Sequence, residues 1–98
     1  MAEQTNFCGN PNWSLVPEHT RDSIRLYVER HFHPGDFVHA VMSNNFILAS
    51  RLADEKNRAQ LADIGRFVYA YCPGDYCGDP ANVNAWLTYN RNEEDSAD

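Results

Sequence analysis

The chain has 98 residues, of which 43% are hydrophobic and 12% aromatic, and its formal net charge is −6. This length suits one domain, and the apolar content is too high for a disordered chain. Four acids lie in the last six residues, so the remaining chain carries ten acids against eight bases. Such a balance gives no extended basic surface for a nucleic acid duplex.

The sequence also lacks the patterns of a membrane or secreted protein and of a zinc site. It has no apolar run of about 20 residues and no basic segment followed by an apolar one at its start, so it predicts neither a membrane span nor a secretory signal. Cys8, Cys72 and Cys77 form an odd set, and the four residues between the last two exceed the spacing of a zinc knuckle. The sequence predicts a cytoplasmic protein with reduced thiols and no metal or cofactor.

The first predicted elements are a flexible arm and a helix. Residues 1–12 are polar, and Phe7 and Trp13 are expected to anchor parts of the arm to the core. Pro17 suits the first turn of a helix, which Pro34–Gly35 should end. Its apolar face has helical spacing and comprises Ile24, Tyr27, Val28, His31 and Phe32.

The next two predicted helices meet at a pair of asparagines. Asp36 can cap a helix that runs to about Ser43. Because asparagine tolerates the left-handed conformation and can cap free helix ends, Asn44–Asn45 predicts a tight corner, with a third helix starting at Asn45.

Capping residues also mark the last two predicted helices. Asp54 should begin a fourth helix that ends near Tyr71, and Gly65 in its middle indicates a close neighbour there. Asp79–Pro80 is a start signal for a short final helix. The chain is therefore predicted to be all-α, a compact bundle of about five short helices over residues 13–90, with a disordered acidic tail over 91–98.

No familiar catalytic pattern occurs in the sequence. The four histidines lack the spacing of a metal site, and no serine lies in a Gly–x–Ser–x–Gly turn. Cys72 lies on the apolar stripe of its helix, as an inert filler would. There is no glycine-rich phosphate loop. These features favour a protein that is not an enzyme.

The residue types do favour binding of a small anion. Arg21 and Arg25 lie one turn apart, which indicates either a solvated face or an anion contact through Arg25. Uncharged donors lie near helix ends, where free N–H groups favour phosphate, at Asn44, Asn45 and Asn57. Tyr69 and Tyr76 could stack on a base or on a partner protein.

The order of several short motifs resembles a family of small proteins encoded by phages and by bacterial genomes that carry prophages. The resemblance covers about Val16 to Leu87 and omits the arm and the tail. The family has no established activity, so the resemblance implies no catalytic residues. The motifs are Pro17–Glu18–His19, Tyr27–Val28–Glu29, Pro34–Gly35–Asp36–Phe37, Ala40–Val41, Asn44–Asn45, Ala53–Asp54 with Asn57, Phe67–Val68–Tyr69, Pro73, Gly78–Asp79–Pro80 and Trp86.

What this resemblance implies is a phage accessory protein in the cytoplasm of an infected bacterium. Small phage proteins often counter host defence, and we expect a homo-oligomeric sponge that sequesters a nucleotide immune signal of cyclic dinucleotide or ADP-ribose type. Two alternatives stay open: an inhibitor or adaptor that blocks a host protein, and a small enzyme that degrades the signal. The expected ligand contacts are phosphate at Arg25 and Arg66, base or ribose at Asn44, Asn45 and Asn57, stacking on Tyr69, and phosphate or a helix cap at His19.

Overall fold

The computed structural model describes residues 6–97 and the side chains of residues 6–88, and this part of the chain is all-α, as predicted. It contains six α-helices, against about five predicted, and one short 3₁₀ helix. Their bounds are η1 (Trp13–Leu15), α1 (Glu18–Arg30), α2 (Asp36–Met42), α3 (Phe46–Leu52), α4 (Glu55–Ala59), α5 (Leu61–Tyr71) and α6 (Pro80–Ala97).

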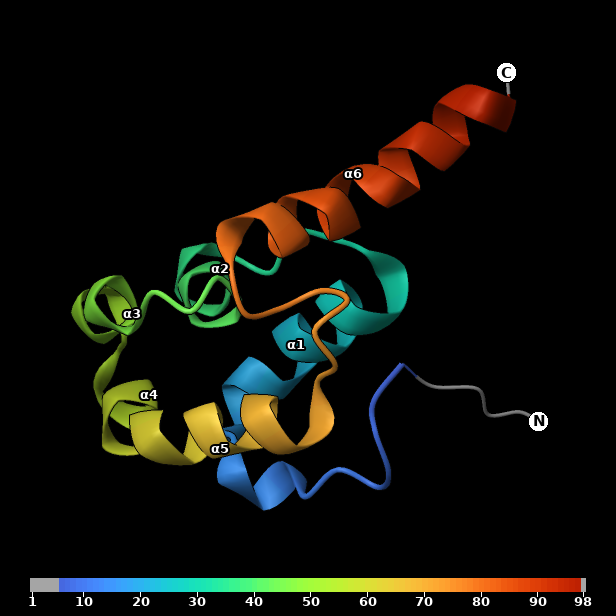
Figure 1. Ribbon diagram of the computed structural model, residues 1–98. Helices are drawn as coiled ribbons and strands as arrows, with labels where there is room; N and C mark the ends of the chain where they lie inside the picture. The colour runs from blue at the N-terminus through green and yellow to red at the C-terminus, as the bar shows by residue number, and fades with distance from the viewer. Residues whose placement is uncertain (1–5, 98) are drawn as a thin grey trace.

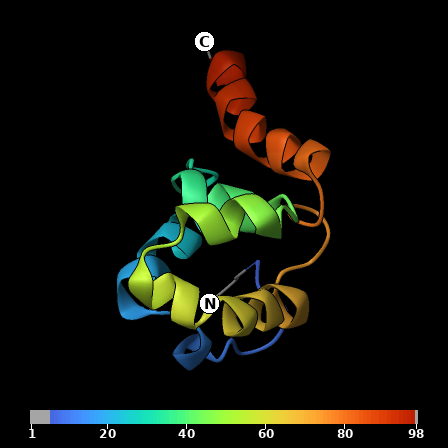
Figure 2. The same ribbon diagram turned by 90° about the vertical axis from the view of Figure 1, so that its left-hand side faces the viewer.

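The helices are arranged in three tiers (Figures 1 and 2). The first part of α6 lies over α2 and α3, which in turn lie over α4 and α5, with η1 beneath. α1 rises from the lowest tier to the middle one. The C-terminal part of α6 extends beyond the other helices (Figure 1). The middle tier therefore separates α6 from α5, and α3 lies at its outer edge.

The buried face of α1 follows the predicted spacing at Ile24, Tyr27 and Val28. The helix nevertheless ends at Arg30, earlier than the sequence predicts, because His31 adopts the left-handed conformation with φ of 60°. His31 donates its Nδ1–H to the Trp86 carbonyl oxygen at 2.9 Å, which holds this end against α6. Phe32, expected on the buried face, is 44% exposed.

The predicted asparagine corner between α2 and α3 is confirmed. Asn44 has a φ of 64°, and Asn45 Oδ1 accepts a hydrogen bond from the Leu48 N–H at 3.2 Å. The predicted cap at Asp36 is wrong. Gly35, with a φ of 92°, is the residue before α2 and Asp36 is its first helical residue, so no side chain caps this end.

Asp54 caps a helix as predicted, since its Oδ1 accepts from the Asn57 N–H at 2.8 Å. The expected single helix to Tyr71 is wrong, because α4 ends at Ala59 and α5 begins anew at Leu61. Thr20 donates a buried hydrogen bond to Asn57 Oδ1 at 2.7 Å, which ties α4 to α1. Because the chain breaks between α4 and α5, the orientation of α5 is not fixed by that of α4, and α5 buries Ile64, Phe67 and Val68 in the core.

Aromatic side chains fill much of the core and link distant segments. The Tyr27 hydroxyl donates to the Tyr76 carbonyl oxygen at 2.6 Å, and Trp86 Nε1 donates to the Tyr27 carbonyl oxygen at 2.7 Å. α1, the loop before α6, and α6 itself are thereby joined. The largest fully buried side chains are those of Tyr27, Tyr76, Phe67, Ile24, Met42, Ile64, Val16, Val28 and Val83.

The first described residues and the start of α6 contact this core. Phe7 is 7% exposed and packs edge-on against Trp13 and Phe67, as expected of an anchor. Asp79 caps α6 as predicted by accepting from the Asn82 N–H at 3.0 Å. That helix is longer than expected, since it includes the acidic residues to Ala97. The flexibility assigned to residues 1–12 and the disorder assigned to residues 91–98 stay predictions, and residues 1–5 and 98 lie outside the described part.

Candidate ligand-binding site

A cavity between α3 and α5 brings together two of the residues that the sequence selected for ligand binding, Asn44 and Tyr69. We call it the α3–α5 cavity; its volume is about 390 Å³, within the range typical of small-molecule sites. Asn44 reaches it from the corner that ends α2. Tyr69 lies on α5 and is 91% exposed, so its ring is free to contact a ligand.

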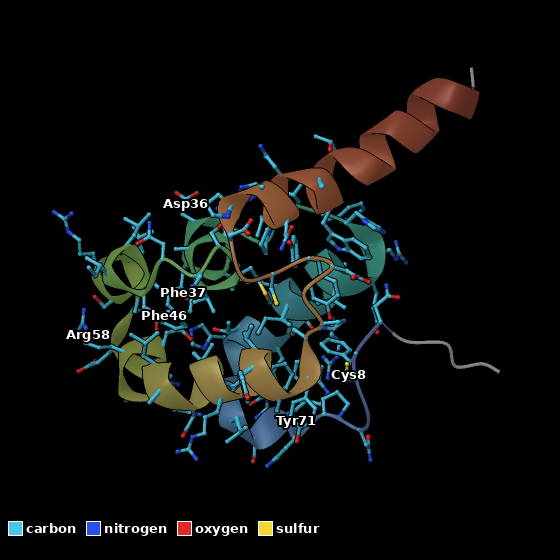
Figure 3. All side chains as sticks on the ribbon, in the orientation of Figure 1. Cys8, Asp36, Phe37, Phe46, Arg58 and Tyr71 are labelled. Atoms are coloured by element: carbon cyan, nitrogen blue, oxygen red, sulfur yellow. The ribbon has the colours of Figure 1, made fainter. Side chains whose placement is uncertain are left out.

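Gly65 lines the α3–α5 cavity and lies close to a side chain of α3. A Cβ atom at Gly65 would lie 3.4 Å from the Phe46 ring of α3. Figure 3 places Phe46 between α3 and the tier formed by α4 and α5. The close neighbour predicted at this glycine is therefore an aromatic ring. With Tyr69 one turn further along α5, two aromatic side chains line one cavity.

The inner wall of the α3–α5 cavity is apolar. Val41 and Val68 line it together with the thiols of Cys72 and Cys77. Burial raises the pKa of Cys72 to about 12, and burial also raises the pKa of Cys77. The Cys77 thiol donates to the carbonyl oxygen of Cys72 at 3.4 Å. Both sulfur groups are therefore neutral at pH 7 and suit an uncharged, flat ligand surface.

A cationic side chain lies next to Tyr69 on α5. Arg66 precedes Tyr69 by three residues, and residues at this spacing are neighbours on a helix surface. Its guanidinium is 3.4 Å from Asp63, and the Arg66 side chain is 73% exposed. An exposed pair of this kind contributes little stability. Arg66 can therefore exchange this partner for an anionic group near Tyr69, although Arg66 itself does not line the cavity.

His19 and Asn57 lie elsewhere, where α1 meets α4. Asp54 Oδ2 accepts from His19 Nε2 at 2.6 Å, and Asn57 accepts from the buried Thr20 hydroxyl. The cap bond from the Asn57 N–H, and then the bond from His19, hold the pKa of Asp54 below its usual value. These bonds join two helices, so His19 and Asn57 have structural partners here.

The hydrogen-bonded pair His19 and Asp54 borders an open cavity of about 850 Å³. This cavity is lined by Pro17, Glu18, His19, Asp54, Glu55, Lys56, Ala59 and Gln60. It contains three carboxylates against one lysine. This charge does not suit the anion that the sequence predicts. The α3–α5 cavity is therefore the better candidate of the two.

Two other predicted ligand residues are separate from both cavities. The Arg25 guanidinium lies 4.3 Å from the centre of the Trp13 ring and 3.2 Å from Asp22. Asn45 uses its side chain to cap α3. The structure thus brings Asn44 and Tyr69 together in one cavity, with Arg66 three residues from Tyr69 on α5, and it does not gather all seven predicted residues into one cleft within the described chain.

Phe46 lines the α3–α5 cavity but was not among the ligand-binding residues predicted from the sequence. The sequence placed Phe46 only on one side of the third predicted helix, and the structure leaves 37% of it exposed and has it line the cavity. The signal that could have found it was Gly65, which indicated a close contact without naming the partner. Only the fold supplies that partner, because the two residues are 19 positions apart.

The described residues contain no group of three or more His, Cys, Asp or Glu side chains placed to hold a metal ion. None of the helices they form is long and apolar enough to cross a membrane.

Comparison with known proteins gives no relative: no protein-family model, no curated protein and no solved structure matches this chain.

Proposed function

We propose that this protein binds and sequesters a small anionic nucleotide in the α3–α5 cavity without altering it. One observation carries the proposal: Phe46, Tyr69 and Asn44, from three separate segments, line the same cavity, with Arg66 one turn from Tyr69. Aromatic faces suit a base, an amide can bond its edge, and a guanidinium binds phosphate.

The proposal also covers the biological role of this binding. We infer a phage accessory protein that counters host defence in the bacterial cytoplasm by removing a nucleotide signal of cyclic dinucleotide or ADP-ribose type. The motif resemblance supports the phage origin. The neutral thiols and apolar wall of the cavity, with no activated nucleophile among its lining residues, favour storage over cleavage.

Isothermal titration of the whole chain with ADP-ribose and with cyclic dinucleotides tests the proposal. Loss of one stacking ring costs about 1–3 kcal/mol, so Tyr69→Ala should weaken binding roughly 5- to 150-fold. Arg66→Gln should weaken binding and reduce its salt dependence. Asn44→Gly should weaken binding while keeping the corner, because glycine accepts the φ of 64°.

Arg30→Gln is the matched control, since Arg30 is an exposed arginine at the end of α1 and should leave binding unchanged. The bound nucleotide is then recovered and chromatographed. Recovery of an altered nucleotide would replace sequestration with an enzymatic role. If folded protein gives no heat with any of these nucleotides, the proposed function is wrong.

A further inference from the structure

The helix α3 presents its large apolar side chains outward and its small ones inward. Ala49 is fully buried against the rest of the molecule. Ile47 is 81% exposed, Leu48 39% and Leu52 43%. Ser50 and Arg51 are the polar residues of α3, and both are exposed beside these apolar side chains. The outer side of α3 therefore has the composition of an interface.

This exposed surface continues from α3 onto α5. Phe46 and Tyr69 line the same cavity, and they are 37% and 91% exposed. We call the surface formed by Phe46, Ile47, Leu48, Leu52 and Tyr69 the α3 face. Figure 2 shows α3 in front, along the edge of the middle tier, where none of the other helices covers it.

The area of the α3 face matches one half of a dimer interface. With roughly 200 Å² for a fully exposed large side chain, the five exposed fractions give about 580 Å² as an upper bound on the apolar surface that the α3 face can bury, because its residues lie on more than one side of the helix. This is near the upper end for the largest apolar patch of a monomer, about 300–600 Å². A stable interface buries about 800 Å² per partner, of which about 65% is apolar in homodimers, or about 520 Å².

The distribution of charge favours a second copy as the partner. The chain has a net charge of −6, so two copies repel each other overall, and four of its acids lie in the last six residues. α3 carries one charged residue, Arg51, and no acid. Arginine is also common in interfaces, whereas Asp and Glu are rare there. A second copy of this acidic chain can approach most closely at α3.

From the area and the charge together, we infer that the α3 face pairs with the α3 face of a second copy in a two-fold symmetric dimer. In such a contact the same patch serves both subunits, and the interface is then closed to further copies. This inference does not depend on nucleotide binding. Because Phe46 and Tyr69 belong to both surfaces, pairing would also cover the mouth of the α3–α5 cavity.

Native mass spectrometry and light scattering of the whole chain, without added nucleotide, test this inference. Across about 1–100 μM protein we expect a dimer that dissociates on dilution. Ile47→Asp should raise the dimer dissociation constant about a hundredfold, because two unpaired carboxylates would be buried at the contact. Ile47 is 81% exposed in the monomer, so the helix content of the variant should equal that of the wild type.

Leu26→Asp is the matched control: Leu26 lies on α1, is 42% exposed and should leave the dimer intact. A wild-type chain that is monomeric throughout the concentration range overturns the inference. So does an Ile47→Asp variant that dimerises like the wild type, or a trimer or larger ring. Purification of a monomer bound to a different protein would assign the α3 face to that protein instead. Nucleotide titration of the monomeric variant then keeps the two proposals apart.

Discussion

Thr20 of α1 donates its hydroxyl to Asn57 of α4 across 2.7 Å, and the two side chains are only 4% and 5% exposed. The same Asn57 donates its backbone N–H to Asp54, the cap of α4. A buried polar pair is stable only while both partners are present. This bond therefore sets where α4 begins relative to α1.

Replacing Thr20 with valine should destabilise the protein by about 1–3 kcal/mol, because the side-chain oxygen Oδ1 of Asn57 would stay buried without its hydrogen-bond donor. Chemical denaturation followed by circular dichroism measures the change. Thr88→Val is the control, since Thr88 is exposed and its hydroxyl donates only to carbonyl oxygens within α6. An equal loss of stability in both variants would contradict a special role for the bond between α1 and α4.

Gly65→Ala should raise the free energy of unfolding by up to about 1 kcal/mol, because alanine favours the helix and its Cβ would only just touch the Phe46 ring. Gly65→Leu should instead displace Phe46, lower the stability and fill the α3–α5 cavity. Thermal melts and nucleotide titration of both variants separate the two effects. A leucine variant that binds nucleotide like the wild type would show that the cavity is not the site.

Acid should destabilise the fold through His39. Partial burial, and then the neighbouring ring of His33, hold the pKa of His39 below its ordinary value of 6.5. The unfolded chain therefore takes up this proton at a higher pH than the folded chain does. The stability contributed by neutral His39 is complete above pH 6.5 and is lost as the pH falls through the lowered value.

Melting temperatures of the wild type and of His39→Asn, measured from about pH 8 to about pH 5, check this sign. The wild type should lose more stability than the variant over that range. Asp36, which acts in the opposite direction on His39, is unchanged in both proteins. If the melting temperatures of the wild type and the variant change equally with pH, His39 is not a source of acid sensitivity.

The three thiols should differ sharply in reactivity. Cys8 is exposed, whereas Cys72 and Cys77 are buried with raised pKa values. Since the thiolate is the reactive form, a disulfide reagent at pH 8 should label one thiol quickly and the other two only on unfolding. Cys8→Ser should abolish the fast phase. Rapid labelling of all three thiols in folded protein would contradict the packing around Cys72.

The helices that the sequence predicts best are those with a local signal at their ends. The caps at Asn45, Asp54 and Asp79 follow from side chains that bond the backbone three residues away, and the corner also uses the left-handed conformation of Asn44. Such contacts need no tertiary structure. The patterns of the printed sequence suffice for them.

Some of the errors involve residues that are distant in the sequence. α1 stops at Arg30, where His31 is left-handed and bonds the carbonyl oxygen of Trp86, 55 positions away. The site was predictable only in part for the same reason: residue type suggested Asn44 and Tyr69, but Arg25 lies over Trp13 instead. Sequence periodicity contains no information on which helix will cross which.

Tyr76 forms hydrogen bonds with two distant segments: its carbonyl oxygen accepts from the Tyr27 hydroxyl, and its own hydroxyl donates to Asn6. Its hydroxyl donates to the Asn6 carbonyl oxygen at 3.0 Å, and its ring lies 4.9 Å from that of Trp86 in α6. The first described residues and the final helix are therefore mechanically coupled through one side chain. Deleting residues 1–10 should therefore loosen α6 at the far end of the sequence, whereas a tag or fusion partner placed before Asn6 should leave α6 in position.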